Sequence, residues 1–377
     1  MDSIHVSENI ARLRRERKLT QEQLAAFMGV TKASVSKWET RQSLPDIILL
    51  PQLAAFFDVT IDELMGYEPQ LSKEQMQKIY LDLSMAFAKE PFEQVMERSR
   101  RLVRKYYSCY PFLNQIACLW VNHFMLAPTE EEQKAVLEET SLLCKRILSD
   151  CTDISLCNDI MILHAMILLQ LGKPEDVIDS LEEFKKPFRL SDQGDSVLIQ
   201  AYLMKGDRDK ADAYTQIAMY NHLLALVGYA TQYLVIHHED VSVCEETIRR
   251  IERVAEKYEM EKLHANTIGL FYYQAAICYC GQGKKEKGLE WLRRYVTCID
   301  HFLESPQLTL RGDRYFDNLD TLFQELELSG NAPRDRSVIF DSLLSSLSHP
   351  AFTLLDQEEE FQTIKAYLVQ KRKSIGN

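Results

Sequence analysis

The sequence predicts an all-α protein built from two parts, and three observations support this. Apolar residues recur at helical spacing along nearly the whole chain, and no stretch alternates as a half-buried strand does. Near the N-terminus, two capped helices are joined by a tight turn. The chain has 377 residues, enough for two or three domains, and 46% of them are hydrophobic, as in a globular protein with a sizeable core.

The two capped helices are expected at residues 21–28 and 32–39. Thr20 precedes the first helix, where its hydroxyl can accept from the backbone two or three residues on, and Thr31 precedes the second in the same way. Gly29 follows the first helix and tolerates the left-handed backbone that turns the chain. Two short helices at this separation match the helix-turn-helix motif, which places its second helix in the major groove of DNA.

Residues 6–66 resemble the XRE-family, lambda-repressor-like DNA-binding domain. The resemblance implies five helices, near 7–17, 21–28, 32–39, 46–57 and 61–66. It implies a small core of Leu13, Leu24, Val30, Val35, Trp38, Leu53, Ala54, Phe57, Val59 and Leu64. It also implies that the first residue of the second helix contacts a phosphate and that the third helix reads bases. The positions placed at the DNA are Gln21, Thr31, Lys32, Ala33, Ser34, Ser36 and Lys37.

The same resemblance pairs Arg14 with Glu39, which would tie the first helix to the end of the third. One position departs from the family: Arg41 stands where glycine is usual, so the following turn is either built differently or strained. The alternative is an ordinary capped helix pair with Lys32 and Lys37 on a solvated face. Domains of this type also serve, in a few cases, for protein contacts only.

Charge is divided unevenly along the chain. Residues 12–41 hold eight Lys or Arg against three Glu, whereas residues 42–70 hold five Asp or Glu and no basic residue. A positive face beside a negative one would orient the domain on a polyanion. Most of the net charge of −12 falls after residue 70, so the larger part suits a regulatory or protein-contact role better than nucleic-acid binding.

A domain boundary is expected at residues 67–72, where Pro69 interrupts the helical pattern and Ser72 can cap the next helix. This gives a DNA-binding domain at 1–66, a linker at 67–72 and a helical domain at 73–377 for sensing and dimerisation. Helices in the larger domain are expected near 73–89, 92–108, 112–126, 130–149, 154–171, 175–185, 194–205, 208–221, 223–237, 241–258, 261–280, 284–304, 315–329, 336–347 and 358–372.

Breaks at Gly172, Gly206 and Gly283 are expected to join helices as antiparallel hairpins. Ala165 stands seven residues before the first of these glycines and Ala276 seven before the third, and Gly172 and Gly206 are 34 residues apart. The pattern resembles the tetratricopeptide repeat, which implies a right-handed superhelix of helix pairs with a concave surface. Gly283 lies 77 residues after Gly206, so an irregular pair is expected between them.

Together, the two parts resemble the RRNPP regulators, which bind short signalling peptides in the concave groove. In that family, asparagines on groove-lining helices hold the peptide backbone, because an amide both donates and accepts. The candidates here are Asn158, Tyr202 and Asn266. The alternative for each asparagine is an exposed helical residue or a local cap, and for the tyrosine a core position.

No pattern indicates an enzyme, a cofactor or a metal site. His237 and His238 are consecutive and cannot share a helix face, so they indicate a solvated turn. The nine cysteines are odd in number and lack CxxC spacing, which favours buried thiols in a reducing cytoplasm. No apolar stretch reaches the roughly 18 residues that a membrane helix needs.

The sequence therefore predicts a homodimeric, cytoplasmic transcription regulator that reads a two-fold-symmetric double-stranded DNA operator. Its helical repeats would receive a signal, expected to be a short peptide. The rival interpretation is an adaptor whose acidic helical domain docks a protein partner, with DNA contact secondary.

Overall fold

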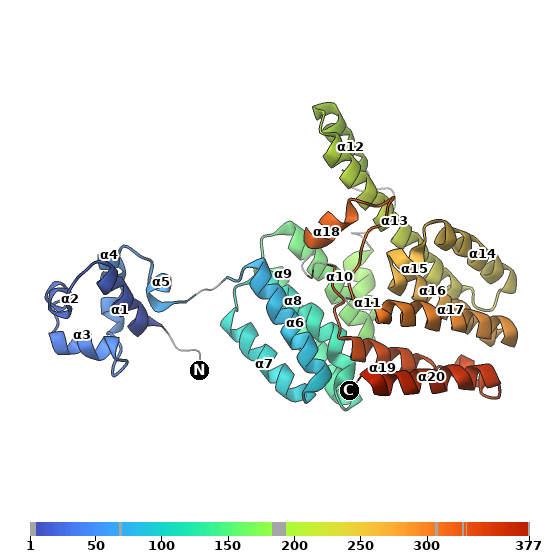
Figure 1. Ribbon diagram of the computed structural model, residues 1–377, viewed down its shortest axis with the longest axis horizontal. Coiled ribbons are helices and arrows are strands. Elements are labelled where there is room, and N and C mark those ends of the chain that lie inside the picture. The colour runs from blue at the N-terminus through green and yellow to red at the C-terminus, as the bar shows by residue number, and fades with distance from the viewer. Residues whose placement is uncertain are drawn as a thin grey trace. The chain divides into compact units, whose positions relative to one another are not determined.

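The structure is a computed structural model that describes residues 5–67, 70–182, 194–305, 308–325, 328 and 330–375 (Figure 1). Every regular element among these residues is a helix, and the single strand-like feature is an isolated antiparallel bridge between Thr309 and Asn331. The all-α class is therefore confirmed. The chain divides into two compact units: residues 1–72 with 101–112, and residues 73–100 with 113–377.

The first unit begins with the five expected α-helices. Their bounds are α1 Val6–Glu16, α2 Gln21–Met28, α3 Lys32–Glu39, α4 Leu50–Phe57 and α5 Ile61–Met65. Thr20, Thr31 and Thr60 each accept a hydrogen bond from the backbone N–H three residues on, which fixes the starts of α2, α3 and α5. The expected helix at 46–57 is instead a 3-10 turn, η1 (Ile47–Leu49), followed by α4.

The core of this domain largely follows the expectation. All of the expected core residues are buried except Val30 and Val59, which are half-buried and pack against the core. The structure adds four buried residues to the set, namely Val6, Ile10, Ala25 and Met28. Burying such side chains stabilises a domain by about 1.5–3 kcal/mol each, and so holds five short helices together.

All five helices end in the same kind of turn. A residue with positive φ follows each helix, directly after α2, α4 and α5 and one residue later after α1 and α3, and the N–H of the next residue donates to the carbonyl five positions back. Glycine occupies this position after α2 and α5, and the other three helices use Lys18, Arg41 and Asp58. Arg41 has φ +60°, so the turn after α3 keeps the usual form and is strained.

The second unit is formed by the helices that follow Ser72. Their bounds are α6 Lys73–Lys89, α7 Phe92–Lys105, α8 Tyr110–His123, η2 Phe124–Leu126, α9 Glu130–Asp150, α10 Ile154–Gln170, α11 Pro174–Leu181, α12 Gly194–Lys205, α13 Arg208–Ile236, α14 Val241–Lys257, α15 Met260–Leu263, α16 Ala265–Gly281, α17 Lys285–Glu304, α18 Leu319–Glu325, α19 Arg336–Ser346, η4 Pro350–Leu355 and α20 Glu359–Ile375. Of α7 and α8, residues 101–105 and 110–112 are counted with the first unit.

Consecutive helices of the second unit pack in pairs, as with α9 and α10, α12 and α13, and α16 and α17 (Figure 1). The turns that join α10 to α11, α12 to α13 and α16 to α17 are built alike. Gly172, Gly206 and Gly283 have positive φ, and in each turn the following N–H donates to the carbonyl five residues earlier, at 2.8–2.9 Å. The glycine hairpins expected from the sequence are therefore present.

Helices α16 and α17 approach each other closely at two glycines. A Cβ built on Gly288 would lie 2.3 Å from Cys280 Sγ, and one built on Gly269 would lie 2.8 Å from Ile299 Cδ1. Side chains larger than hydrogen would therefore push the two helices apart. A small residue is therefore needed at Gly288, where the two helices lie close together.

Several helix bounds in the second unit differ from the sequence expectation: the helix expected at 92–108 ends at Lys105, and the one expected from residue 315 begins at Leu319. Residues 208–221 and 223–237, expected as two helices, form the single helix α13. Asn221 and His222 include no helix breaker, and Tyr220, Leu223 and Val227 continue one buried stripe across them. Because α13 packs on α12 and also on α14, it supplies the irregular pair expected between Gly206 and Gly283.

The expected helix at 261–280 is divided at His264. Its ring Nδ1 accepts from the N–H of Thr267 at 3.2 Å, so His264 caps the start of α16 after the single turn of α15. The nine cysteines are all free thiols, six of them buried and three partly buried. Among the described residues, no helix combines the length and apolar character needed to cross a bilayer.

Candidate nucleic-acid interface

Helix α3 presents one face to the core and the opposite face to solvent. Val35 and Trp38, three residues apart, are 0% and 4% exposed and anchor the helix. Among the residues predicted to meet DNA, Thr31, Lys32, Ala33 and Lys37 are exposed, whereas Gln21, Ser34 and Ser36 are half-buried. The exposed face therefore carries two lysines and a small side chain.

The position of α3 is fixed by a hydrogen-bonded group around Glu39. Arg14 donates from Nε and Nη2 to the two carboxylate oxygens at 2.5 and 2.8 Å, and Gln21 donates from Nε2 at 2.9 Å. Arg14 also donates to the Leu19 carbonyl at 2.6 Å. The side chains of Arg14 and Glu39 are only 12% and 6% exposed. The group joins α1, α2 and α3.

The charges of this group stabilise each other. Burial by itself would raise the pKa of Glu39, but hydrogen bonds from Arg14 and Gln21, together with the arginine's charge, outweigh it and lower that pKa. The hydrogen bond to Glu39 raises the pKa of Arg14. Both groups are therefore ionised near neutral pH. An amide has two donor hydrogens, so Gln21 keeps one for a second acceptor while it is bound to Glu39.

The two lysines of the exposed face are not equivalent. Lys32 forms an ion pair with Glu22 of α2, and the hydrogen bond from Lys32 lowers the pKa of Glu22. Lys37 forms no ion pair with any described residue. A polyanion can therefore meet Lys37 directly, whereas contact with Lys32 requires its release from Glu22.

Thr31 and Ser34 have a structural role in addition to their predicted one. The Thr31 hydroxyl accepts from the Ser34 N–H at 3.1 Å, and the two hydroxyl oxygens are 2.9 Å apart. These contacts fix the first turn of α3. Ser34 is therefore held with its hydroxyl directed at the cap.

The structure also places exposed groups on this domain that the sequence reasoning did not select. Ile47 and Ile48 are 77% and 72% exposed, and the exposed Phe27 ring contacts the Phe56 ring in a tilted pair with centroids 4.2 Å apart. Four consecutive apolar residues at 47–50 cannot all lie on one helical stripe. That run was the available signal for exposed apolar side chains in η1.

The predicted effector residues lie on three different helices of the second unit. Asn158 is exposed on α10, Asn266 is exposed in the first turn of α16, and Tyr202 is half-buried on α12. Tyr202 stacks on Tyr214 at 5.4 Å, with the Lys210 ammonium 5.6 Å from its ring centre. No hydrogen bond joins any two of the three predicted residues.

Comparison with known proteins concerns mainly the first unit. Residues 10–64 match the helix-turn-helix family. A stretch of 80 residues is 36% identical to the HTH-type transcriptional activator BcrR of Enterococcus faecalis, covering 20% of this chain and 39% of that protein. A stretch of 75 residues is 29% identical to the uncharacterized HTH-type transcriptional regulator YobD of Bacillus subtilis, covering 19% and 67%. The match therefore spans about two fifths of the activator.

A comparison of structures extends over more of the chain. The crystal structure of Bacillus thuringiensis PlcR in complex with the peptide PapR7 and DNA overlays on 80% of this chain and 96% of its own, at 18% identity and a TM-score of 0.32. At this TM-score the overlay establishes neither a common arrangement of the units nor a common function. The family match and the geometry of α2 and α3 agree that residues 10–64 form a helix-turn-helix domain.

Proposed function

We propose that this protein, whose residues 10–64 match the helix-turn-helix family, is a sequence-specific DNA-binding transcription regulator. The observation that carries the proposal is the exposed face of α3, which presents Lys37 without an ion-pair partner among the described residues. Glu39 holds α3 against α1 and α2 through its bonds to Arg14 and Gln21. A rigid helix with exposed donors suits readout of base edges in the major groove.

Different residues of the domain take different roles in this proposal. Lys37, with Lys32 once it leaves Glu22, donates to base acceptors such as guanine O6 and N7. Ala33 allows close approach, and Thr31, Ser34 and Ser36 lie beside the bases. Gln21 uses its second amide hydrogen on a backbone phosphate and so sets the register of α3 on the duplex.

The second unit would receive the signal, and we propose a short peptide as effector and a cytoplasmic homodimer as the working form. Paired helices joined by short turns provide extended surfaces of the kind that bind peptides. A two-fold dimer would present two copies of α3 to a two-fold operator. Asn158, Tyr202 and Asn266 remain the contacts predicted from the sequence.

One observation favours an adaptor function as the second candidate. On α12, Val197, Leu203 and Met204 are 64%, 53% and 90% exposed, so this helix presents apolar side chains to solvent. In this alternative a protein partner covers α12, and DNA contact is secondary.

The test is selection of bound fragments from genomic DNA, followed by titration on the selected site and on random DNA of the same length. A specific regulator is expected to bind the selected site about 10³-fold or more tightly at fixed salt. Absence of any enriched sequence, or equal affinity for both DNAs, would reject sequence-specific binding and favour the adaptor.

A further inference from the structure

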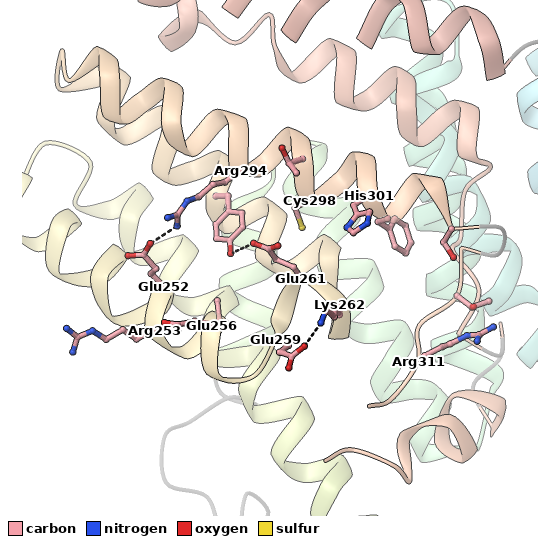
Figure 2. A pocket seen from close by; sticks show the side chains of 16 residues that line it. Glu252, Arg253, Glu256, Glu259, Glu261, Lys262, Arg294, Cys298, His301 and Arg311 are labelled. Atoms are coloured by element: carbon pink, nitrogen blue, oxygen red, sulfur yellow. Dashed lines mark hydrogen bonds and ion pairs between the residues drawn. The ribbon is translucent and has the colours of Figure 1, made fainter. Parts of the chain in front are cut away.

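A large groove lies in the second unit, lined mainly by α14, α15 and α17 and by Ser305, Thr309 and Arg311 (Figure 2). Its volume is about 1430 Å³. Pockets for drug-sized ligands are about 300–1,000 Å³, so this groove suits a short peptide better than a small metabolite. The residues predicted from the sequence to bind the effector, Asn158, Tyr202 and Asn266, do not line this groove.

Two of the basic groups that line the groove are already paired. Arg294 donates to Glu252 at 2.6 Å and also stacks over Trp291, with 4.5 Å from its guanidinium carbon to the ring centre. Lys262 donates to Glu259 at 2.6 Å. Figure 2 shows both ion pairs as dashed lines at the groove.

Glu261 differs from these acids because it has no ion pair with any described residue. It accepts a hydrogen bond from the hydroxyl of Tyr272, which is 4% exposed, at 2.9 Å. Glu261 of α15 and Cys298 of α17 both line the groove, and both are labelled in Figure 2. Burial and the charge of Glu261 together raise the pKa of Cys298 to about 12, and the same two causes raise the pKa of Tyr272. The carboxylate therefore lines the groove without an ion-pair partner among the described residues.

The chain that leaves this groove pairs with a second segment of the same unit. Leu310 donates its N–H to the Gly330 carbonyl at 2.9 Å, and Ala332 donates to the Leu308 carbonyl at 2.8 Å. We name residues 308–310 and 330–333 the strap. One strap residue, Thr309, lines the groove itself.

The strap is hydrogen-bonded to α6 at its far end. The carbonyl of Pro333 accepts from the Tyr80 hydroxyl at 3.2 Å and from the Ser84 hydroxyl at 3.1 Å. Tyr80 and Ser84 are 1% and 4% exposed, so these bonds are shielded from water and costly to break. Helix α6 begins at Lys73, directly after the segment 1–72 that contains the helix-turn-helix domain.

We propose that this groove binds a short peptide through a basic group placed beside Glu261, and that the strap transmits binding to α6. The proposal rests on the proposed function, since it assigns the effector site and its connection to the DNA-binding domain. A basic group would neutralise Glu261 through an ionic hydrogen bond, which is stronger than a hydrogen bond between neutral groups. A peptide that touches Thr309 would favour one position of the strap, and α6 follows because two buried hydroxyls hold Pro333.

The first test uses the full chain without DNA, so it does not depend on operator binding. Four pools of synthetic hexapeptides differ only in one fixed residue, which is Arg, Lys, Gln or Glu. The Arg and Lys pools are expected to raise the melting temperature more than the Gln and Glu pools, because a ligand of the native state stabilises it. No shift with any pool, or equal shifts with all four, would overturn the groove assignment.

Three variants locate the effect. Glu261→Gln keeps an acceptor for Tyr272 and is expected to lose the preference for basic pools. Glu239→Gln, at a side chain that is 91% exposed in the turn after α13, is the matched control and should keep it. If Asn158→Ala with Asn266→Ala removes the peptide response while Glu261→Gln retains it, the site is the surface predicted from the sequence and the groove assignment is wrong.

The second test addresses the strap, with the best-binding peptide and a selected operator. Tyr80→Phe with Ser84→Ala removes both donors to Pro333. The double variant is expected to bind the peptide as the wild type does but to lose its effect on operator affinity, which in the wild type should be roughly 5- to 150-fold. Tyr229→Phe with Ser149→Ala, both on exposed helix faces, is the control and should keep the effect.

The outcomes separate the proposals. A double variant that responds to peptide like the wild type overturns the role of the strap. If the double variant melts early, Ser84→Ala by itself is used, because Tyr80 still holds Pro333 and a smaller loss of response is expected. If the wild-type protein binds basic peptides but selects no operator, the groove assignment stands and the DNA-binding function is rejected.

Discussion

Glu39 holds three helices of the helix-turn-helix domain together. It accepts hydrogen bonds from Arg14 and Gln21, and its side chain is only 6% exposed. A carboxylate at this depth is tolerated because both of its oxygens have charged or amide donors. Removing it leaves the guanidinium of Arg14 buried with a single carbonyl partner, Leu19.

We therefore expect Glu39→Ala to lower the free energy of unfolding by about 3 kcal/mol, the lower end of the cost of breaking a buried pair. Urea unfolding of the full chain, followed on the transition of the helix-turn-helix domain, measures this. Glu16→Ala is the control: Glu16 forms an exposed pair with Arg12, at 3.0 Å, and its loss should cost less than about 1 kcal/mol. Equal effects of the two substitutions would contradict the role given to Glu39.

Lys37 is the second residue with a specific expectation. Its ammonium is exposed on α3, and it forms no ion pair among the described residues. Lys37→Ala should weaken binding to the selected operator by about 1–3 kcal/mol and change binding to random DNA little. Titrations on both DNAs at one salt concentration measure the difference.

The matched control for this substitution is Lys134→Ala, which removes the same charge from an exposed position of α9. It should leave both affinities unchanged. An equal loss on operator and random DNA for Lys37→Ala would assign Lys37 to phosphate and not to a base.

At the scale of the element, the turn after α3 carries strain that a glycine would relieve. Arg41 has φ +60°, a conformation that costs an L-residue about 1–2 kcal/mol. Arg41→Gly should therefore stabilise the domain by about 1 kcal/mol, reduced by the loss of the exposed pair with Glu8 and by the greater freedom of glycine in the unfolded chain. Thermal unfolding of the full chain measures the change.

The reciprocal substitution is Gly29→Ala. Gly29 has φ +66° and open space around the missing Cβ, so only the backbone conformation opposes alanine there. Gly29→Ala should therefore lower the melting temperature, whereas Arg41→Gly should raise it. A lower melting temperature for Arg41→Gly would show that the pair with Glu8 outweighs the strain.

The pair formed by α16 and α17 gives a second expectation at this scale. Gly288→Ala would place a Cβ 2.3 Å from Cys280 Sγ and 3.3 Å from the Cys280 backbone nitrogen, so the two helices must separate. We expect a loss of about 1–3 kcal/mol in the free energy of unfolding. Gly281→Ala, at the end of α16 with open space around it, is the control and should be neutral or slightly stabilising. Equal stability of the two variants in urea would remove the packing argument.

At the scale of the whole molecule, the expectation concerns assembly. Two helix-turn-helix domains read half-sites about 34–36 Å apart, which requires a dimer that fixes their spacing. We expect the full chain and residues 73–377 to sediment as dimers at micromolar concentration, and residues 1–72 as a monomer. A monomeric fragment 73–377 would reject the second unit as the dimer contact.

The sequence by itself determined the local structure of the first unit. Thr20 and Thr31 fix helix starts, and Gly29 fixes a helix end, through hydrogen bonds that reach no more than five residues. The pattern of buried residues on α3 follows from the same short spacing. For this reason the helix bounds and the exposed face of α3 were predictable, and the pairing of α16 with α17 followed from small residues at fixed offsets.

Other features depended on contacts that no short window contains. Only the tertiary structure placed the Glu22 carboxylate on Lys32 and left Glu261 without an ion-pair partner among the described residues. The bond from Tyr80 to Pro333 links positions 253 residues apart. Helix caps and turns are decided by neighbours along the chain, whereas grooves and buried charges are decided by which distant segments pack together, and that depends on the shape of every intervening helix.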